Sequence, residues 1–238
     1  MDNEYNRELY RLYSKYWGGI YEVLRKFRHE GYNVSYPLLL YVFRDYTETK
    51  IKLLIIGQQT EEWNRMGEPE ESDDIICELM RSYRDFRLGD DASNPSSPFR
   101  RTARNLYMGL NPGYPRYGFM WTNLIKVDQQ NGYEGSTRPI EEIEEAICEV
   151  FPVVPHEVRI LEPDVVVFFT GPSYDKRLEK TFLGVKFIRV SGISKKELSL
   201  IRGNEVLPEL TFRTYHPNYL QRTRKLERII KAIVEITK

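Results

Sequence analysis

Polar side chains that can hydrogen-bond a planar ligand stand directly after four apolar segments of this sequence. The four groups are Gly57-Gln58-Gln59-Thr60, Trp121-Thr122-Asn123, Gly171-Pro172-Ser173-Tyr174 and His216-Pro217-Asn218. Amide, hydroxyl and imidazole groups both donate and accept hydrogen bonds, and glycine after a strand lets the backbone approach a ligand closely. The set is poor in charge, so it suits the edge of a nucleic-acid base or another planar heterocycle.

The same residues exclude several common enzyme sites. Gly57 is followed by glutamines, so neither the dinucleotide-binding glycine pattern nor a phosphate-binding Gly-Lys-Ser/Thr loop is present. No serine lies in a Gly-x-Ser-x-Gly turn. Two cysteines, Cys77 and Cys148, are too few within one chain for a disulfide framework, a four-cysteine zinc site or a four-cysteine iron–sulfur cluster. We therefore expect no metal and no cofactor.

Hydrophobic patterning predicts the elements that position these groups. Short apolar runs predict strands over 52–56, 119–127, 164–170, 185–190 and 210–215. Helical spacing or helix-start signals predict helices over 4–29 (with Gly18-Gly19 as a candidate interruption), 73–84, 98–110, 137–161 (with a break near 152–155) and 219–236. The composition of residues 89–98 predicts a loop. Continuous apolar strands alternating with helices indicate a mostly parallel sheet covered on both faces. In such folds ligands bind beyond the carboxyl ends of the strands, where the four groups stand.

Composition sets the broad class of the protein. The chain has 238 residues, of which 41% are hydrophobic and 29% charged, which is typical of a globular protein. Its 35 basic residues balance 35 acidic ones, which argues against an obligate nucleic-acid coat protein, although arginines cluster locally around 100–104 and 213–228. The first residues do not resemble a signal peptide, and the apolar runs are too short to span a bilayer. We expect a soluble, cytoplasmic monomer with no membrane partner.

The order of these motifs resembles the uracil-DNA glycosylase superfamily over roughly residues 51–222. A buried strand leads into Gly57-Gln58-Gln59, a second strand bears Asn123, and an apolar strand leads into Gly171-Pro172-Ser173. Tyr215-His216-Pro217-Asn218 then precedes a helix. The resemblance implies a three-layer α/β/α sandwich with a mostly parallel central sheet at residues 49–238, after an N-terminal helical extension at residues 1–48. With two cysteines, the chain is similar to the divergent, cluster-free members of the superfamily.

The resemblance also assigns roles to the matched residues. Superfamily enzymes flip a damaged base out of DNA and hydrolyse its N-glycosidic bond. In that scheme His216 donates a hydrogen bond to the oxygen of the departing base, and Asn123 reads the pyrimidine edge. Substrate-binding roles are expected for Gly57, Gln58 and Asn218, and an aromatic ring stacks on the base, with Phe99 as first candidate and Trp63 as second. DNA phosphates are expected to meet Ser173, Arg100, Arg101, Arg222 and Arg224.

One departure from the family motif leaves two functions open. Gln59 stands where the most active relatives carry an aspartate that orients water. A neutral amide can position water but cannot act as a base, and Glu61 or Glu62 are the nearest carboxylates that could substitute. The first interpretation is a DNA glycosylase of low or altered activity, with DNA as partner. The alternative is a non-catalytic protein that binds nucleic acid or nucleotides and retains the base pocket. A third interpretation is an enzyme with an unrelated doubly wound fold, whose strand-end residues match the family by chance; strand ends that do not converge on one pocket would favour it.

Overall fold

The computed structural model describes residues 3–61, 63, 73–86, 97–130 and 135–238. Its helices are α1 (Glu4–His29), α2 (Arg44–Thr47), α3 (Asp73–Phe86), α4 (Pro98–Leu110), α5 (Glu141–Val150), α6 (Val154–Leu161), the 3₁₀ turn η2 (Pro172–Tyr174), α7 (Asp175–Thr181), α8 (Pro217–Arg222) and α9 (Leu226–Thr237). Its strands are β1 (Asn33–Val34), β2 (Leu53–Gln59), β3 (Met120–Ile125), β4 (Gln129–Gln130), β5 (Ser136–Thr137), β6 (Val165–Phe168), β7 (Lys186–Arg189), β8 (Leu198–Arg202) and β9 (Leu210–Thr214). The predicted loop at 89–98 lies mostly outside the described residues.

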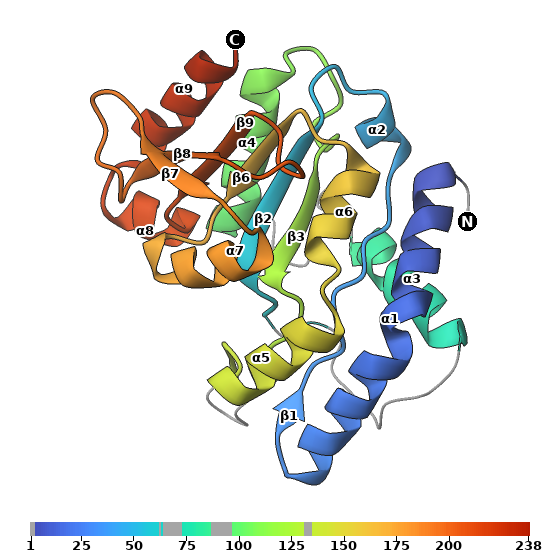
Figure 1. The fold of residues 1–238 in the computed structure, drawn as a ribbon. Helices are drawn as coiled ribbons and strands as arrows, with labels where there is room; N and C mark the ends of the chain where they lie inside the picture. Colours follow the sequence, from blue (N-terminus) through green and yellow to red (C-terminus); the bar gives the residue numbers. More distant parts are fainter. Residues whose placement is uncertain (1–2, 62, 64–72, 87–96, 131–134) are drawn as a thin grey trace. The chain divides into compact units, whose positions relative to one another are not determined.

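The architecture is α/β, with a mostly parallel central sheet flanked by helices, as predicted (Figure 1). The strand order is β3-β2-β6-β9-β8-β7. β2 pairs with β6 and β6 with β9 in parallel, whereas β8 pairs with both β9 and β7 in antiparallel fashion. The apolar run of β6 is buried along its whole length, which explains why it forms a central strand. β8 is an element that the sequence analysis did not predict.

The chain divides into two compact units. Unit 1 comprises Met1–Val42, Gln59–Asp85 and Asn123–Ile160, and unit 2 comprises Phe43–Gln58, Phe86–Thr122 and Leu161–Lys238. The division passes along β2 between Gln58 and Gln59 and along β3 between Thr122 and Asn123. The predicted division of the chain after residue 48 stays a prediction.

Within unit 1, α1 is one continuous helix rather than two. Its buried face repeats at helical spacing through Leu9, Tyr13, Trp17, Ile20, Leu24 and Phe27. The helix continues through Gly18 and Gly19. Gly19 lies where α5 packs closely against α1, since a Cβ there would lie 3.2 Å from the Cβ of Val150. A small antiparallel sheet of β1, β4 and β5 completes the strands of this unit.

Within unit 2, helices cover both faces of the sheet. α4, α8 and α9 contact one another, and α9 contacts β9. Successive residues of a strand point to opposite faces: Phe169 meets Phe99 of α4, whereas Phe168 meets Phe182 at the end of α7. In Figure 1, accordingly, α4 lies behind the sheet and α7 in front of it. This three-layer arrangement leaves the turns after β6 and β9 at one end of the unit.

The predicted helix over 219–236 was wrong in extent, because two helices occupy that segment. α8 ends at Arg222, and Arg224 adopts a left-handed backbone conformation with φ of 58°. The Lys225 N–H then donates to the Leu220 carbonyl at 2.8 Å, which closes the helix end. No helix in the described part of the chain is both long and apolar enough to cross a membrane.

Candidate functional site in unit 2

His216 stands at the junction of β9 and α8, where it caps the helix. Its Nδ1 accepts a hydrogen bond from the backbone N–H of Asn218 at 3.3 Å. An accepting Nδ1 carries no proton, so the ring proton of the neutral imidazole is assigned to Nε2. Burial lowers the pKa of His216 below its ordinary value of 6.5. His216 is therefore a neutral group whose Nε2–H is a hydrogen-bond donor.

Phe99, the second residue of α4, lies against His216. The two rings are nearly parallel, at 23°, with centroids 5.9 Å apart. Two further rings contact Phe99 edge-to-face: the ring centroid of Trp121 in β3 lies 6.1 Å from that of Phe99, and the centroid of Phe169, directly after β6, lies 5.7 Å away. Phe99 itself is half-buried. Elements far apart in the sequence thus bring a histidine and three aromatic rings together.

A further aromatic contact, between Phe86 and Trp121, extends this cluster toward Arg100. Phe86, at the end of α3, lies 6.0 Å from Trp121 between ring centroids. The guanidinium of Arg100 lies 4.2 Å above the Phe86 ring, a distance at which a cation is attracted by the ring face. Burial lowers the pKa of Arg100, and its buried Nη1 has no hydrogen-bond partner in the described part of the chain. Arg100 is therefore partly enclosed beside the aromatic cluster.

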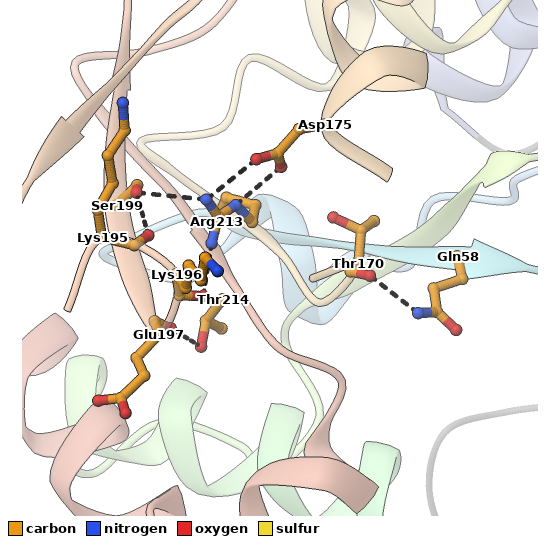
Figure 2. A network of polar contacts seen from close by, with 9 residues as sticks. All are labelled: Gln58, Thr170, Asp175, Lys195, Lys196, Glu197, Ser199, Arg213 and Thr214. Carbon is orange, nitrogen blue, oxygen red and sulfur yellow. Dashed lines mark hydrogen bonds and ion pairs between the residues drawn. The ribbon is translucent and has the colours of Figure 1, made fainter. Parts of the chain in front are cut away.

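Gln58, at the end of β2 after the buried Gly57, points toward the end of β6. Its Nε2 donates to the Thr170 carbonyl at 2.8 Å (Figure 2). This bond uses the amide nitrogen and leaves the amide oxygen as the group that can accept from a ligand. The bond also ties the turn after β2 to the residue beside Phe169. Gln58 and Phe99 both therefore adjoin the Phe169–Thr170 segment.

Three predicted site residues belong to unit 1. Asn123 lies within β3 rather than after it and is buried, and Gln59 is the half-buried last residue of β2. Trp63 is only 7% exposed, its ring meets Tyr83 edge-on, and its backbone N–H donates to Asp128. So enclosed a ring offers little surface for stacking, which favours Phe99 over Trp63. A shared site of these three residues with His216 stays a prediction. Of the two glutamates considered as substitutes for the missing aspartate, Glu61 is exposed and Glu62 lies outside the described residues.

The residues predicted to meet phosphates are mostly exposed. Ser173 lies exposed in the turn after β6, and Asn218, which was predicted to bind the base instead, lies exposed in the first turn of α8. The Nη2 of Arg101 in α4 donates to the Oε1 of Gln221 in α8 at 3.4 Å, and Gln221 directly precedes Arg222 in the chain. The guanidinium of Arg222 lies 5.8 Å from the ring of Tyr219. Arg101 thus lies against α8, whereas Arg100 turns toward Phe86.

Sequence reasoning missed the buried ion pair beside this site. Arg213 of β9 is 1% exposed and its Nε lies 2.9 Å from the Asp175 carboxylate at the start of α7 (Figure 2). Burial raises the pKa of Asp175 and lowers the pKa of Arg213, while each partner's charge opposes the shift. The turns are joined further by the Gly171 N–H, which donates to the Thr214 carbonyl at 2.9 Å. Gly171 has φ of +74°, and a Cβ there would meet the Tyr215 ring at 3.2 Å.

The described residues contain no group of three or more His, Cys, Asp or Glu side chains placed to hold a metal ion. Comparison with known proteins adds no family: neither protein-family models nor curated protein sequences match this chain. The likeness to uracil-DNA glycosylases therefore rests on the motifs in the sequence.

Proposed function

We propose that this chain recognises a nucleic-acid base held outside its strand and hydrolyses the base's N-glycosidic bond, as uracil-DNA glycosylases do. The observation that carries the proposal is the state of His216. Its Nδ1 is occupied by the Asn218 N–H, so its Nε2–H is the donor that remains. When a glycosidic bond breaks, negative charge collects on the oxygen of the leaving base, and a fixed donor there lowers the barrier.

The rings around Phe99 support a planar ligand. A base that stacks on an aromatic side chain gains about 1–3 kcal/mol, and every base offers such a face. Phe99 is half-buried and held by Trp121 and Phe169, so its ring is oriented before a ligand arrives. The amide oxygen of Gln58 adds an acceptor for a base N–H, since the amide nitrogen is bonded to Thr170.

Gln59 favours a second function, a base-binding protein without hydrolysis. Hydrolysis needs a water molecule oriented toward the sugar, and a carboxylate both orients that water and stabilises the cationic sugar. The amide of Gln59 carries no charge and cannot accept a proton. A chain with this residue keeps the chemistry of recognition, while its hydrolytic step is weakened or lost.

One experiment separates the two functions. Labelled oligonucleotides with a single uracil, hypoxanthine or mismatched thymine are incubated with the protein, treated with alkali to cleave abasic sites, and tested in parallel for binding. Strand scission that disappears in His216→Ala supports the glycosylase. His29→Ala is the matched control, because His29 is exposed at the end of α1 in unit 1. Binding without scission supports the second function, and neither binding nor scission contradicts both.

A further inference from the structure

The connection between β7 and β8 ends in a hydrogen-bonded turn in which three successive carbonyl groups, those of residues 195–197, accept from side chains. The N–H groups of Glu197 and Leu198 both donate to the Ser194 carbonyl, at 2.9 and 3.0 Å. The last carbonyls of a helical turn have no partner within it. Here Lys195 O accepts from Ser199 Oγ at 2.7 Å, Lys196 O from Arg213 Nη1 at 2.8 Å and Glu197 O from Thr214 Oγ1 at 2.7 Å (Figure 2).

Two further contacts hold the same segment, residues 191–197, which we term the 191–197 loop. The Glu197 carboxylate lies 2.5 Å from the ammonium of Lys225, a residue between α8 and α9. The Gly192 carbonyl accepts from Arg228 of α9 at 2.5 Å. Fixing a residue's backbone costs about 1–2 kcal/mol of conformational entropy, and exposed loops are usually among the least firmly held parts of a protein. The 191–197 loop is therefore held more firmly than is usual for an exposed loop.

The side chains that the loop presents are cationic. Lys195 and Lys196 are both exposed, while the carbonyls of the same residues are turned toward the strands. Two carboxylates of this region are paired with other cations, Asp175 with Arg213 and Glu197 with Lys225. Lys195 lies close enough to Asp175 to oppose the rise of that carboxyl's pKa. The loop therefore holds two positive charges at the protein surface.

The strand that anchors the loop is the strand that leads to His216. Arg213 and Thr214 hold the carbonyls of Lys196 and Glu197, and His216 follows Thr214 by two residues along the chain. The Gly171 N–H donates to the Thr214 carbonyl, so the turn after β6 joins the same end of β9. The backbone of the two lysines is thus tied to β8 and β9, the strand that leads to His216, by contacts within unit 2.

We propose that the 191–197 loop is a phosphate-contacting surface, on which Lys195 and Lys196 bind the backbone of the nucleic acid whose base reaches His216. Lysine acts as a compact point charge, which suits contact with phosphates irrespective of sequence. A loop ordered beforehand loses less entropy on binding. The choice of a nucleic acid rests on the proposed function of the His216 site; the fixed cationic surface is independent of it.

The test measures binding of a fluorescein-labelled duplex of about 20 base pairs without any damaged base, by anisotropy, over a series of salt concentrations. Each phosphate that the protein no longer neutralises lowers the slope of log affinity against log salt by about 0.9. We therefore expect the double variant Lys195→Gln/Lys196→Gln to lower that slope by about 1.8, with affinity at 0.1 M salt reduced by tens of fold. The matched control is Lys231→Gln/Lys238→Gln, which replaces two other exposed lysines, one on α9 and one directly after it.

The outcomes distinguish this inference from the proposed function. Because the duplex carries no damaged base, a chain that fails to release any base can still show weaker binding when Lys195 and Lys196 are replaced. An unchanged slope in the double variant overturns the inference, as does a wild-type chain that does not bind the duplex at low salt. Competition by poly-glutamate as effective as competition by unlabelled duplex overturns the choice of nucleic acid in favour of an acidic protein.

Discussion

Unit 1 contains a buried ion pair whose removal gives a sharp test of its packing. The Lys126 ammonium lies 2.7 Å from the Glu157 carboxylate, and the two side chains are 3% and 0% exposed. The Tyr13 hydroxyl donates to the same carboxylate oxygen at 2.7 Å and accepts from the Leu40 N–H at 3.0 Å. Burial lowers the pKa of Lys126, although the charge of Glu157 opposes that shift.

Lys126→Met leaves the Glu157 carboxylate buried without the ammonium of Lys126, while the Tyr13 hydroxyl still donates to it. Removing one partner of a buried pair costs about 3–5 kcal/mol, because an uncompensated charge remains away from water. Lys126→Met/Glu157→Leu removes both charges and leaves the Tyr13–Leu40 bond in place, but the buried Tyr13 hydroxyl loses the carboxylate to which it donates. Replacing a buried pair by apolar residues is often neutral or stabilising, whereas a buried hydroxyl that loses its acceptor costs about 1–3 kcal/mol. The double variant is therefore expected to recover part of the loss.

Urea unfolding followed by tryptophan fluorescence measures these free energies. The three tryptophans are Trp17 and Trp63 in unit 1 and Trp121 in unit 2, so a Trp121→Phe background restricts the signal to unit 1. Lys26→Met is the control: Lys26 is 58% exposed with partners at 3.9 and 4.0 Å, and its replacement is expected to cost less than about 0.5 kcal/mol. A single variant as stable as the control, or a double variant no better than the single one, refutes the reasoning.

Three further predictions concern His216, Gln59 and the arginines expected to contact phosphates. The pKa of His216 is lowered in the folded protein. Its contribution to the free energy of unfolding is therefore complete above pH 6.5 and is lost as the pH falls through the lowered pKa. In an NMR titration, the chemical shift of its ring carbon should change at a lower pH in the folded chain than in the urea-unfolded chain. Gln59→Asp should raise the rate of base release by about tenfold or more, since general-base assistance is typically worth about 100-fold. His216→Ala in the Gln59→Asp background should abolish that gain. If Gln59→Asp leaves the rate at background on every damaged base, the site is not that of a glycosylase weakened by the loss of its carboxylate. Arg101→Gln/Arg222→Gln should lower the salt slope of duplex binding by about 1.8, and a slope equal to that of wild type removes these arginines from the phosphate contacts.

Apolar runs made the central strands predictable. Val165 to Phe169 is a continuous apolar segment and forms β6 with its flank. β8 was missed because its buried Ser199 breaks the apolar pattern. The Ser199 hydroxyl donates to the Lys195 carbonyl and accepts from Arg213 of β9, contacts that the pattern of apolar residues does not reveal. The end of α8 was missed because Arg224, rather than glycine, takes the left-handed position.

The candidate site was predictable where strand ends meet and unpredictable where charges are buried. The strand-end rule pointed to Gln58 and His216, and the Ser97-Pro98 helix start pointed to Phe99, which the structure places against His216. The Arg213–Asp175 pair left no local signal, because an arginine within a strand and an aspartate before a helix are both common at surfaces. Only the three-dimensional contact distinguishes the buried pair from solvated charges.

Release of the free base tests the central claim most directly. The protein is incubated with a duplex containing one uracil, hypoxanthine or mismatched thymine, and the base set free in solution is quantified by mass spectrometry against the abasic sites formed. The account predicts that at least one base is released intact, in a one-to-one ratio with abasic sites, and that release is lost in His216→Ala but kept in His29→Ala. Base release that persists in His216→Ala, or no release from any of the three duplexes, contradicts it.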